Sequence, residues 1–178
     1  MPKSRIFSKA DREIIIILHN IRSTFNVGAI LRTAECLGLK QAFATGYTPN
    51  LEYCTDNNQP ILPHIKAKLK RSLHVSALGA EEIVKFNYHN DINQLIIELK
   101  NQDYQIIGLE QNQKSIPLDN YRPTQKIALL LGEEVNGIDA RLIDQCDSLI
   151  ELAMFGQKES YNVAVATGIC LYNLVTKP

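Results

Sequence analysis

Three short segments, far apart in the chain, carry polar residues at the ends of apolar runs. These residues are Asn26 with Arg32, Gly132 with Glu134, and Ser160 with Asn162. An arginine behind a loop with a polar amide can grip a phosphate or a ribose, because its guanidinium offers several donors in a fixed geometry. A carboxylate two residues after a glycine, at the rim of a sheet, suits the same kind of site. The segments therefore predict a polar ligand site, provided that the fold brings them together.

Each segment also has a purely structural explanation. Arg32 could be an ordinary surface arginine, and Glu133 with Glu134 a solvated acidic pair after a turn. Ser160 and Asn162 stand just before an apolar segment, where such residues commonly cap a helix by accepting hydrogen bonds from its first amides. For each segment taken singly, the structural explanation is at least as strong as the functional one.

Two glycines bear on the kind of ligand. Gly28 lies one helical turn before Arg32 on the same face, which predicts open space beside the guanidinium. Gly132 directly follows a buried apolar run, where a glycine lets a ligand approach the backbone. Neither glycine belongs to the GxGxxG pattern of dinucleotide sites or to a P-loop ending in GK[ST]. NAD and ATP are therefore weak candidates.

The elements that must position these residues alternate between strands and helices. Residues 14–18 form a continuous, mostly β-branched run, typical of a strand buried on both faces of a parallel sheet. Further strands are predicted at 41–46, 83–88, 105–109, 127–131 and 149–153, and helices at 28–37, 91–100, 139–146 and 162–175. This alternation predicts an α/β fold with a mainly parallel sheet flanked by helices, whose ligands bind at the carboxyl ends of the strands.

The connection over residues 47–80 is unusually long for a compact domain, and such connections are commonly functional or disordered. It contains three prolines and no acidic residue from Asn57 to Ala80. Its basic residues are the best candidates for a contact with an RNA or DNA backbone, against the alternative of a solvated loop. They are Lys66, Lys68, Lys70 and Arg71.

The N-terminal residues 1–12 are predicted to form a flexible basic tail, which could add to that contact. The tail carries Lys3, Arg5, Lys9 and Arg12 and has few apolar residues. Residues 13–178 are predicted to form a single domain, because they contain no repeat or linker and are enough to bury a full core.

Composition excludes several classes of protein. The formal net charge is zero and the pI is near 6.9, so the chain is not a globally basic nucleic-acid binder. The cysteines are scattered, with no CxxC pair, which favours reduced thiols and neither disulfides nor a metal site; they are Cys36, Cys54, Cys146 and Cys170. No signal peptide or membrane span is apparent, and we expect a cytoplasmic protein.

The C-terminal segment predicts a second packing surface. From Val163 to Leu171 it has almost no polar face, and a helix that is apolar all round is buried on more than one side. One face can pack on the sheet of its own domain and another on a second subunit. We therefore expect a homodimer.

Taken together and in order, the three segments resemble the SpoU (TrmH-like) family of RNA ribose 2′-O-methyltransferases, within the SPOUT superfamily. Residues 26–34 are similar to the first motif of the family, 131–138 to the second and 150–166 to the third, and the resemblance spans about residues 13–175. Three departures stand in or near the third motif. The family usually has proline in place of Ala153, leucine in place of Tyr161, and often serine in place of Ala164.

The resemblance implies a C-terminal trefoil knot, binding of S-adenosyl-L-methionine, a tRNA or rRNA substrate, and a dimer through the terminal helix among other elements; it implies no metal. It also implies two sets of site residues. The cofactor would be held largely by backbone groups, at Leu109, Gly132, Leu152, Ser160 and Tyr161. The target nucleotide and the catalytic step would involve Asn26, Arg32, Glu134, Ser160 and Asn162.

The role of Arg32 follows from its chemistry. Arginine keeps its proton up to a pKa above about 12, so Arg32 is assigned to orienting the ribose and stabilising developing charge, with proton removal shared by phosphate, water or a strongly perturbed Arg32. One alternative is a catalytically silent RNA-binding dimer of the same fold. Another is a nucleotide-binding α/β protein of unrelated chemistry, for which the sequence offers no phosphate loop.

Overall fold

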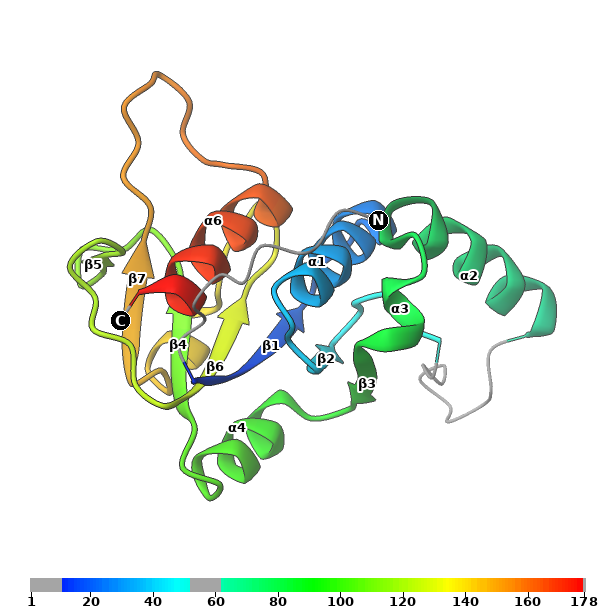
Figure 1. Ribbon diagram of the computed structural model, residues 1–178, viewed down its shortest axis with the longest axis horizontal. Helices are drawn as coiled ribbons and strands as arrows, with labels where there is room; N and C mark the ends of the chain where they lie inside the picture. Colours follow the sequence, from blue (N-terminus) through cyan, green and yellow to red (C-terminus); the bar gives the residue numbers. More distant parts are fainter. Residues whose placement is uncertain (1–10, 52–61, 178) are drawn as a thin grey trace, which may run out of the picture.

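The computed structural model describes residues 11–51 and 62–177, and these are built around one seven-stranded sheet (Figure 1). All its pairings are parallel, and the strand order is β3-β2-β1-β6-β4-β7-β5. The carboxyl ends of the strands therefore meet at one edge. The strands are β1 (Glu13–His19), β2 (Gln41–Thr45), β3 (Lys85–His89), β4 (Gln105–Leu109), β5 (Ile116–Pro117), β6 (Lys126–Leu131) and β7 (Ser148–Glu151).

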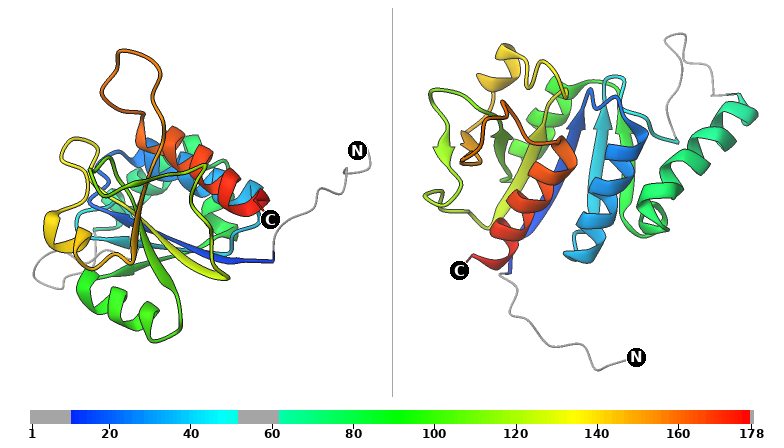
Figure 2. Two further views of the ribbon diagram at one scale, coloured as in Figure 1. Left: turned by 90° about the vertical axis from the view of Figure 1, so that its left-hand side faces the viewer. Right: turned by 90° about the horizontal axis from the view of Figure 1, so that it is seen from above.

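Helices cover both faces of this sheet (Figure 2). The long helices α1 (Thr24–Cys36), α2 (Pro63–Ala77) and α6 (Val163–Thr176) lie on one face, with the short α3 (Ala80–Ile83) next to them. Helices α4 (Ile92–Lys100) and α5 (Ala140–Ile143) lie on the other. The α/β fold with a parallel, helix-flanked sheet is thereby confirmed. The trefoil knot stays a prediction.

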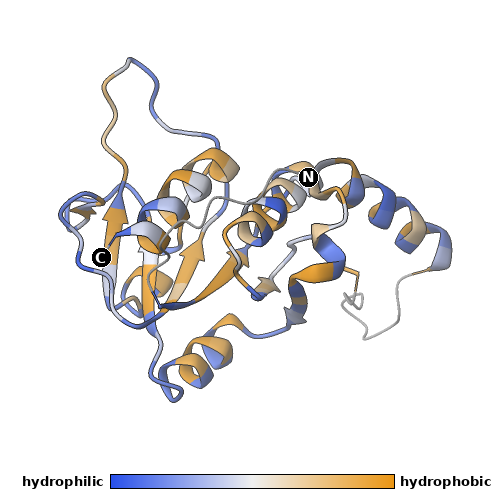
Figure 3. Cartoon of the chain, in the orientation of Figure 1, coloured by the Kyte–Doolittle hydropathy of each residue, from blue (hydrophilic) through white to orange (hydrophobic). Residues whose placement is uncertain are grey.

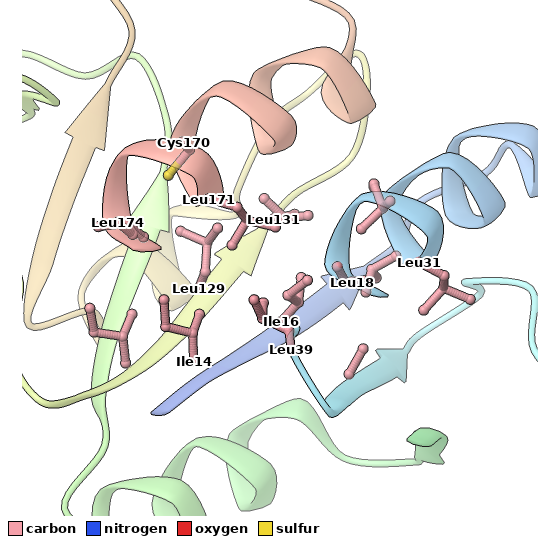
Figure 4. Packing of buried hydrophobic residues seen from close by; sticks show 14 of the residues in the cluster. Ile14, Ile16, Leu18, Leu31, Leu39, Leu129, Leu131, Cys170, Leu171 and Leu174 are labelled. Atoms are coloured by element: carbon pink, nitrogen blue, oxygen red, sulfur yellow. The ribbon is translucent and has the colours of Figure 1, made fainter. Parts of the chain in front are cut away.

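Two apolar cores, one on each face, hold the layers together. Side chains alternate across a strand, so Ile14, Ile16 and Leu18 of β1 face α1 and α6 (Figure 4), whereas Ile15 and Ile17 face α4 and α5. Residues in the middle of β1 are fully buried, as the continuous apolar run predicts. The central strands stand out as hydrophobic in Figure 3. Because β1 is buried on both faces, it is held rigidly and anchors the loop that follows it at the carboxyl edge of the sheet.

The first helix begins earlier than predicted. The expected loop to Val27 is wrong, because Ser23 caps α1 by accepting a hydrogen bond from the amide of Asn26 (3.3 Å). This start places Asn26 in the first turn of α1, directly above the end of β1. The helix ends at Cys36 and is followed by Gly38, which has a positive φ of 71°, as expected for a C-terminal glycine.

The connection over residues 47–80 contains a helix where the sequence predicts an irregular or functional loop. Residues 52–61 lie outside the described part of the chain, and α2 follows them, with Pro63 in its first turn. Prolines and a low share of apolar residues hide this helix from a periodicity analysis, because only its C-terminal half faces the core. Toward its N-terminus α2 extends past the β3 edge of the sheet (Figure 1).

Gly28 serves this packing of α1 on α2. A Cβ atom added to it would lie 2.2 Å from Ser76 Oγ and 2.7 Å from the carbonyl oxygen of Leu73, both on α2. The prediction that Gly28 leaves space beside Arg32 is therefore wrong: the space is filled by a neighbouring helix. A glycine at this position lets two helices approach more closely than any side chain would permit.

Smaller differences concern the ends of elements. Asp91 caps α4 by accepting bonds from the amides of Asn93 and Gln94, and the Gln94 side chain bonds Glu98, so Asp91 and Gln94 do not form a reciprocal capping box. The strand predicted from residue 83 begins at Lys85, after a short helix. The two-residue β5 was not predicted, since its exposed sequence has no strand pattern.

Candidate active site

A cavity of about 510 Å³ lies at the carboxyl edge of the sheet, formed by the segments that follow β4, β6 and β7 and by the start of α6. The segment between β7 and α6 extends outward from this edge (Figure 1). All five residues predicted to hold a cofactor line this one cavity, although they come from four different parts of the sequence. They are Leu109, Gly132, Leu152, Ser160 and Tyr161.

A chain of hydrogen bonds joins the three predicted segments at the rim of the cavity. The Asn162 side chain donates to Asn26 Oδ1 (3.2 Å), and Asn26 Nδ2 donates to Glu134 Oε1 (3.1 Å). In the side chains of both asparagines the oxygen accepts a hydrogen bond while the nitrogen donates another, so the successive bonds polarise one another. Asn26 thus forms one polar unit with two residues that lie more than a hundred positions away in the sequence.

Glu134 ends this chain as an ionised carboxylate. Its two oxygens also accept the backbone amides of Arg22 (3.1 Å) and Ser23 (3.2 Å). Burial raises the pKa of Glu134, but the hydrogen bonds from Arg22, Asn26 and Ser23 outweigh burial and lower the pKa below its usual value. The negative charge is therefore fixed where the loop after β1 meets the loop after β6.

Asn162 has a structural role as well. It caps α6, with Oδ1 accepting the amides of Ala164 (2.9 Å) and Val165 (3.3 Å). The structural explanation of this residue is thus correct, and its Nδ2 remains available for Asn26. Ser160 does not cap the helix; it lies exposed in the cavity lining.

Two of the departures from the family pattern contact each other. The Tyr161 hydroxyl donates a long hydrogen bond to the carbonyl oxygen of Ala153 (3.4 Å). The bond joins the two ends of the outward-extending segment between β7 and α6. Tyr161 therefore both lines the cavity and ties the segment that carries Ser160.

Gly132 is required by the loop itself. An added Cβ would lie 2.4 Å from the backbone of Gly137 and 2.5 Å from the amide nitrogen of Ile138. The expectation that Gly132 leaves space for a ligand is wrong, because the loop folds back and its backbone fills the place that a side chain would occupy. Two backbone bonds between Glu133 and Gly137 (2.9 and 3.0 Å) close this loop.

Glu110 supports the same loop and was not predicted. Its carboxylate accepts the amide of Ile138 (2.7 Å) and contacts the position of Gly137, whose φ is +68°. Glu110 follows β4 with no distinctive pattern around it, so only the fold reveals its role. It joins four other glutamates in the cavity lining, where none of the described lining residues is lysine or arginine; these are Glu133, Glu134, Glu151 and Glu159.

Arg32 lies outside this cavity. It is exposed on α1, and neither a hydrogen bond nor an ion pair links it to the part of the chain that the structure describes. By helical spacing it shares a face with Phe25 and Cys36, which are also exposed. Within one subunit the structure therefore joins Asn26, Glu134 and Asn162 but leaves Arg32 apart.

The predicted RNA-binding residues are all exposed and all lie on α2. Lys66 and Lys70 follow one ridge of the helix and Lys68 and Arg71 another, so the charge spreads around α2 and does not form a single stripe. Lys70 is 3.5 Å from Glu82, an exposed ion pair of little energetic weight.

Of the basic N-terminal residues, Lys3, Arg5 and Lys9 lie outside the described part of the chain. Arg12 is described, and its guanidinium donates to the carbonyl oxygens of Leu174 and Lys177 at the end of α6. Cationic donors at this end of a helix satisfy carbonyls that lack partners within the helix.

Other features of the described residues can be stated briefly. Cys36, Cys146 and Cys170 are free thiols, and Cys54 lies outside the described residues. Over residues 11–51 and 62–177, no group of three or more potential metal ligands comes together. None of the helices in these ranges has the length and apolar character needed to cross a membrane.

Comparison with known proteins fits this geometry. The chain is 27% identical over 165 residues to the tRNA (guanosine(18)-2'-O)-methyltransferase of Borreliella burgdorferi; the match covers 92% of this chain and 66% of that enzyme, just under two thirds. The solved TrmH/SpoU tRNA modifying enzyme of A. aeolicus superposes with a TM-score of 0.73 at 23% identity, covering 92% of this chain and 74% of the other. The AdoMet-bound rRNA methyltransferase of Sinorhizobium meliloti gives a TM-score of 0.72 at 20% identity, with coverages of 95% and 57%.

These likenesses agree with a match to a family model, which extends over residues 13–172, nearly the whole chain. All three motif segments fall within the matched range. The chain belongs to the SpoU rRNA Methylase family.

Proposed function

We propose that the protein is an S-adenosyl-L-methionine-dependent RNA methyltransferase that methylates a ribose 2′-hydroxyl of tRNA or rRNA. The observation that carries the proposal is the hydrogen-bonded unit of Asn26, Glu134 and Asn162 at the rim of the cavity. Membership of the SpoU family and the names of its relatives, which include tRNA and 23S rRNA 2'-O-methyltransferases, support it.

The cavity fits the proposed cofactor in size and charge. About 510 Å³ lies within the roughly 300–1,000 Å³ of typical ligand pockets. Leu109, Leu131 and Leu152 supply apolar surface for an adenine ring. The lining carries glutamates and no cation among its described residues, which favours a positively charged ligand over a phosphate-bearing one. When bound, S-adenosylmethionine supplies a methyl group on a cationic sulfur.

The residues at the rim would position the other reactant. Glu134, held ionised, can accept a hydrogen bond from a ribose hydroxyl, and Ser160, which also lines the cavity, offers a hydroxyl. Because Asn26 and Asn162 are already bonded to Glu134 or to each other, little reorganisation is needed on binding. Placing the oxygen in line with the methyl group can by itself supply much of the rate. The hydroxyl proton leaves to water or to an RNA phosphate.

We assign Arg32 to the site of a second subunit in a homodimer. Helix α6 exposes an apolar stripe of Val165, Ile169 and Tyr172, which are 53%, 45% and 62% exposed. Helix α1 packs beside it, with Gly168 of α6 against Thr33, so Arg32 borders the same surface. A dimer through this surface would cover the stripe and carry Arg32 toward the partner, where it can orient the ribose and stabilise developing charge.

The basic residues of α2 are the proposed contact for the RNA backbone, with any contribution from the N-terminal tail added to them. The exposure of all four residues supports this, since phosphate contacts need cations that solvent can reach. The affinity for RNA should fall as the salt concentration rises. Arg71→Ala should make this fall less steep, whereas the control Lys40→Ala, on the loop before β2, should leave it unchanged. The proposed setting is the cytoplasm, with residues 13–178 acting as one domain.

The proposal is tested by labelled methyl transfer. Purified protein is incubated with labelled S-adenosylmethionine and total RNA, and the modified ribose is mapped by nuclease digestion. Label at a 2′-hydroxyl of tRNA or rRNA is expected. Calorimetry with S-adenosylmethionine in the absence of RNA gives a second measurement. Cofactor binding without any transfer would refute the enzymatic activity, and failure to bind the cofactor would refute the assignment of the cavity.

Sedimentation tests the dimer. A stable monomer at micromolar concentration would refute it. Val165→Glu places a charge on the proposed interface and should yield a monomer, whereas Ile97→Glu, on the outer side of α4, is the matched control and should not change the sedimentation coefficient.

A further inference from the structure

An aromatic residue stands next to the proposed ribose site without belonging to the cavity. Tyr47 follows β2 and is 44% exposed, and burial, followed by the nearby Glu133 carboxylate, raises the pKa of its hydroxyl. Glu133 lines the cavity, next in sequence to Glu134. The ring thus approaches the rim from the loop after β2, which supplies none of the cofactor residues and no member of the hydrogen-bonded unit.

Arg22 completes this cluster. Its Nη2 donates to Glu133 Oε1 (3.0 Å), and its guanidinium carbon lies 6.0 Å from the centre of the Tyr47 ring. The backbone amide of the same residue donates to Glu134. A single residue therefore links the aromatic ring to the carboxylate that would hold the ribose. The Arg22 side chain is 73% exposed, so most of its donors face solvent.

The backbone beneath Tyr47 is held unusually firmly. Its amide donates to Asn20 Oδ1 (3.2 Å), and Asn20 itself has a positive φ of 59°. Gly46 also has a positive φ, and a Cβ there would lie 1.9 Å from Asn20 Oδ1, so only glycine fits. A non-glycine residue in this conformation costs free energy and persists only where its surroundings fix it.

A half-buried histidine, His19, fixes Asn20 in turn. Asn20 Nδ2 contacts His19 Nε2 (3.1 Å), and His19 Nδ1 contacts Thr45 Oγ1 (2.8 Å). Since Asn20 Oδ1 accepts the Tyr47 amide, its Nδ2 must donate to the imidazole, which is therefore neutral with its proton on Nδ1. The backbone of Tyr47 is thus fixed through Asn20, and its ring lies beside the Arg22–Glu133 ion pair.

Other exposed aromatics lack this combination. Phe25 lies on the outer face of α1, Phe155 is almost fully exposed on the segment between β7 and α6, and Tyr161 lines the cavity itself. Tyr47 is set apart by its fixed backbone and by the Arg22–Glu133 ion pair beside its ring. A ribose placed at Glu134 carries a base a few ångströms away, and single-stranded RNA bases are commonly stacked on aromatic rings and guanidinium planes.

We propose that Tyr47, braced by Arg22 and Glu133, is the platform on which the base of the target nucleotide stacks. The proposal rests on the methyltransferase function and adds the element that would orient the nucleotide about its glycosidic bond. Tyr47 is a positioning residue: it contacts the base and does not take part in the transfer of the methyl group.

The first test pairs a change in the protein with a change in the RNA. The substrate is the RNA fragment identified by methyl-transfer mapping, with either the natural target nucleotide or an abasic ribose that keeps its 2′-hydroxyl. Tyr47→Leu should raise KM for the natural RNA by about 5- to 150-fold, the range expected for one stacked base, without changing the affinity for S-adenosylmethionine. Tyr47→Phe should stay within about 3-fold of wild type, because it keeps the ring.

The abasic RNA separates stacking from a structural effect. With wild-type protein it should suffer a loss similar to that caused by Tyr47→Leu, and the combination should lose little more. If the two losses multiply, Tyr47 does not contact the base and the proposal is overturned. Normal transfer by Tyr47→Leu on natural RNA would overturn it too while leaving the methyltransferase function intact.

A fluorescence experiment tests the contact without catalysis. The chain has no tryptophan, so Tyr47→Trp carries a single tryptophan at the platform. Titration with bulk tRNA and S-adenosylhomocysteine should quench this tryptophan, and abasic ribose 5-phosphate should not. Ile97→Trp, on α4, is the control and should not respond. Quenching without methyl transfer would support the base contact while the proposed activity fails, and equal responses of both tryptophans would refute the platform.

Discussion

Replacing Asn26 by aspartate changes one polar group at the centre of the site and almost nothing else. In the native protein Asn26 Nδ2 donates to Glu134 Oε1 at 3.1 Å, and Asn26 Oδ1 accepts from Asn162. In Asn26→Asp the second bond can persist, because a carboxylate oxygen still accepts it. The bond to Glu134 is lost, and a carboxylate oxygen of Asp at position 26 faces one of Glu134. The lowered pKa of Glu134 keeps its carboxylate ionised.

The size of the effect follows from the distance. Two unit charges 3.1 Å apart repel by about 1.3 kcal/mol at the dielectric constant of water and by about 5 kcal/mol at an effective value of 20. Loss of the hydrogen bond adds about 1 kcal/mol. Since the Glu134 carboxylate is only partly buried, we expect a decrease in the free energy of unfolding near the lower end, about 2–3 kcal/mol at pH 7.

The pH dependence distinguishes repulsion from a packing defect. The two carboxyl groups of Asn26→Asp can share one proton, so their first protonation occurs at higher pH than that of Glu134 in the wild type. The difference in stability between wild type and variant should therefore shrink as pH falls from 7 toward 4.5, by at most about 1.4 kcal/mol per pH unit. Urea unfolding at several pH values measures this, with Asn26→Ala as the uncharged control. A deficit that does not change with pH would refute the reasoning.

Three further outcomes are expected. Gly28→Ala should lower the free energy of unfolding by about 1–2 kcal/mol in urea denaturation, because the clash with α2 outweighs the gain in helix propensity, and adding Ser76→Ala should restore part of the loss; a variant as stable as wild type would contradict the close approach. Burial, opposed by the charge of Asp139, lowers the pKa of His19. The neutral His19 therefore contributes its full stability above about pH 6.5, the usual pKa of histidine, and this contribution is lost as the pH falls from about 6.5 through the lowered pKa. This fall should be absent in His19→Gln, and an unchanged pH profile would refute the neutral imidazole. Arg32→Ala should abolish methyl transfer while calorimetric affinity for S-adenosylmethionine stays within about 2-fold, and retained activity would refute a catalytic role.

The parts of the fold that sequence alone predicts are those with strong local patterns. The apolar run at 14–18 specifies a doubly buried strand, and its parallel pairing on both sides follows. Asp91 and Asn162 were recognisable as helix caps, because side-chain oxygens that accept the first amides of a helix are local features. Helix α2 was not predicted, because half of it does not face the core and its sequence therefore lacks a regular apolar period.

At the site, residue types were predictable but contacts were not. Asn26, Glu134 and Asn162 were chosen from the sequence, yet their direct bonding depends on the order of parallel strands, which no local pattern encodes. The two glycines were assigned to ligand access, and the structure shows that neighbouring backbone occupies the space at Gly28 and Gly132. A glycine in the sequence can indicate that another group approaches the backbone closely, but it does not indicate whether that group is a ligand or another part of the protein.

The hydrogen-bonded unit also has a consequence for synthesis of the protein. Asn26 is bonded across 108 residues to Glu134 and across 136 to Asn162. A domain generally folds as a unit, and β1 lies between β2 and the much later β6, so the sheet is completed only when the later strands have been made. Its polar rim stays open until the start of α6 has been made. The nascent chain therefore contains α2 and its cations well before the polar unit can close, so the proposed methyl transfer would have to wait until the start of α6 has been made.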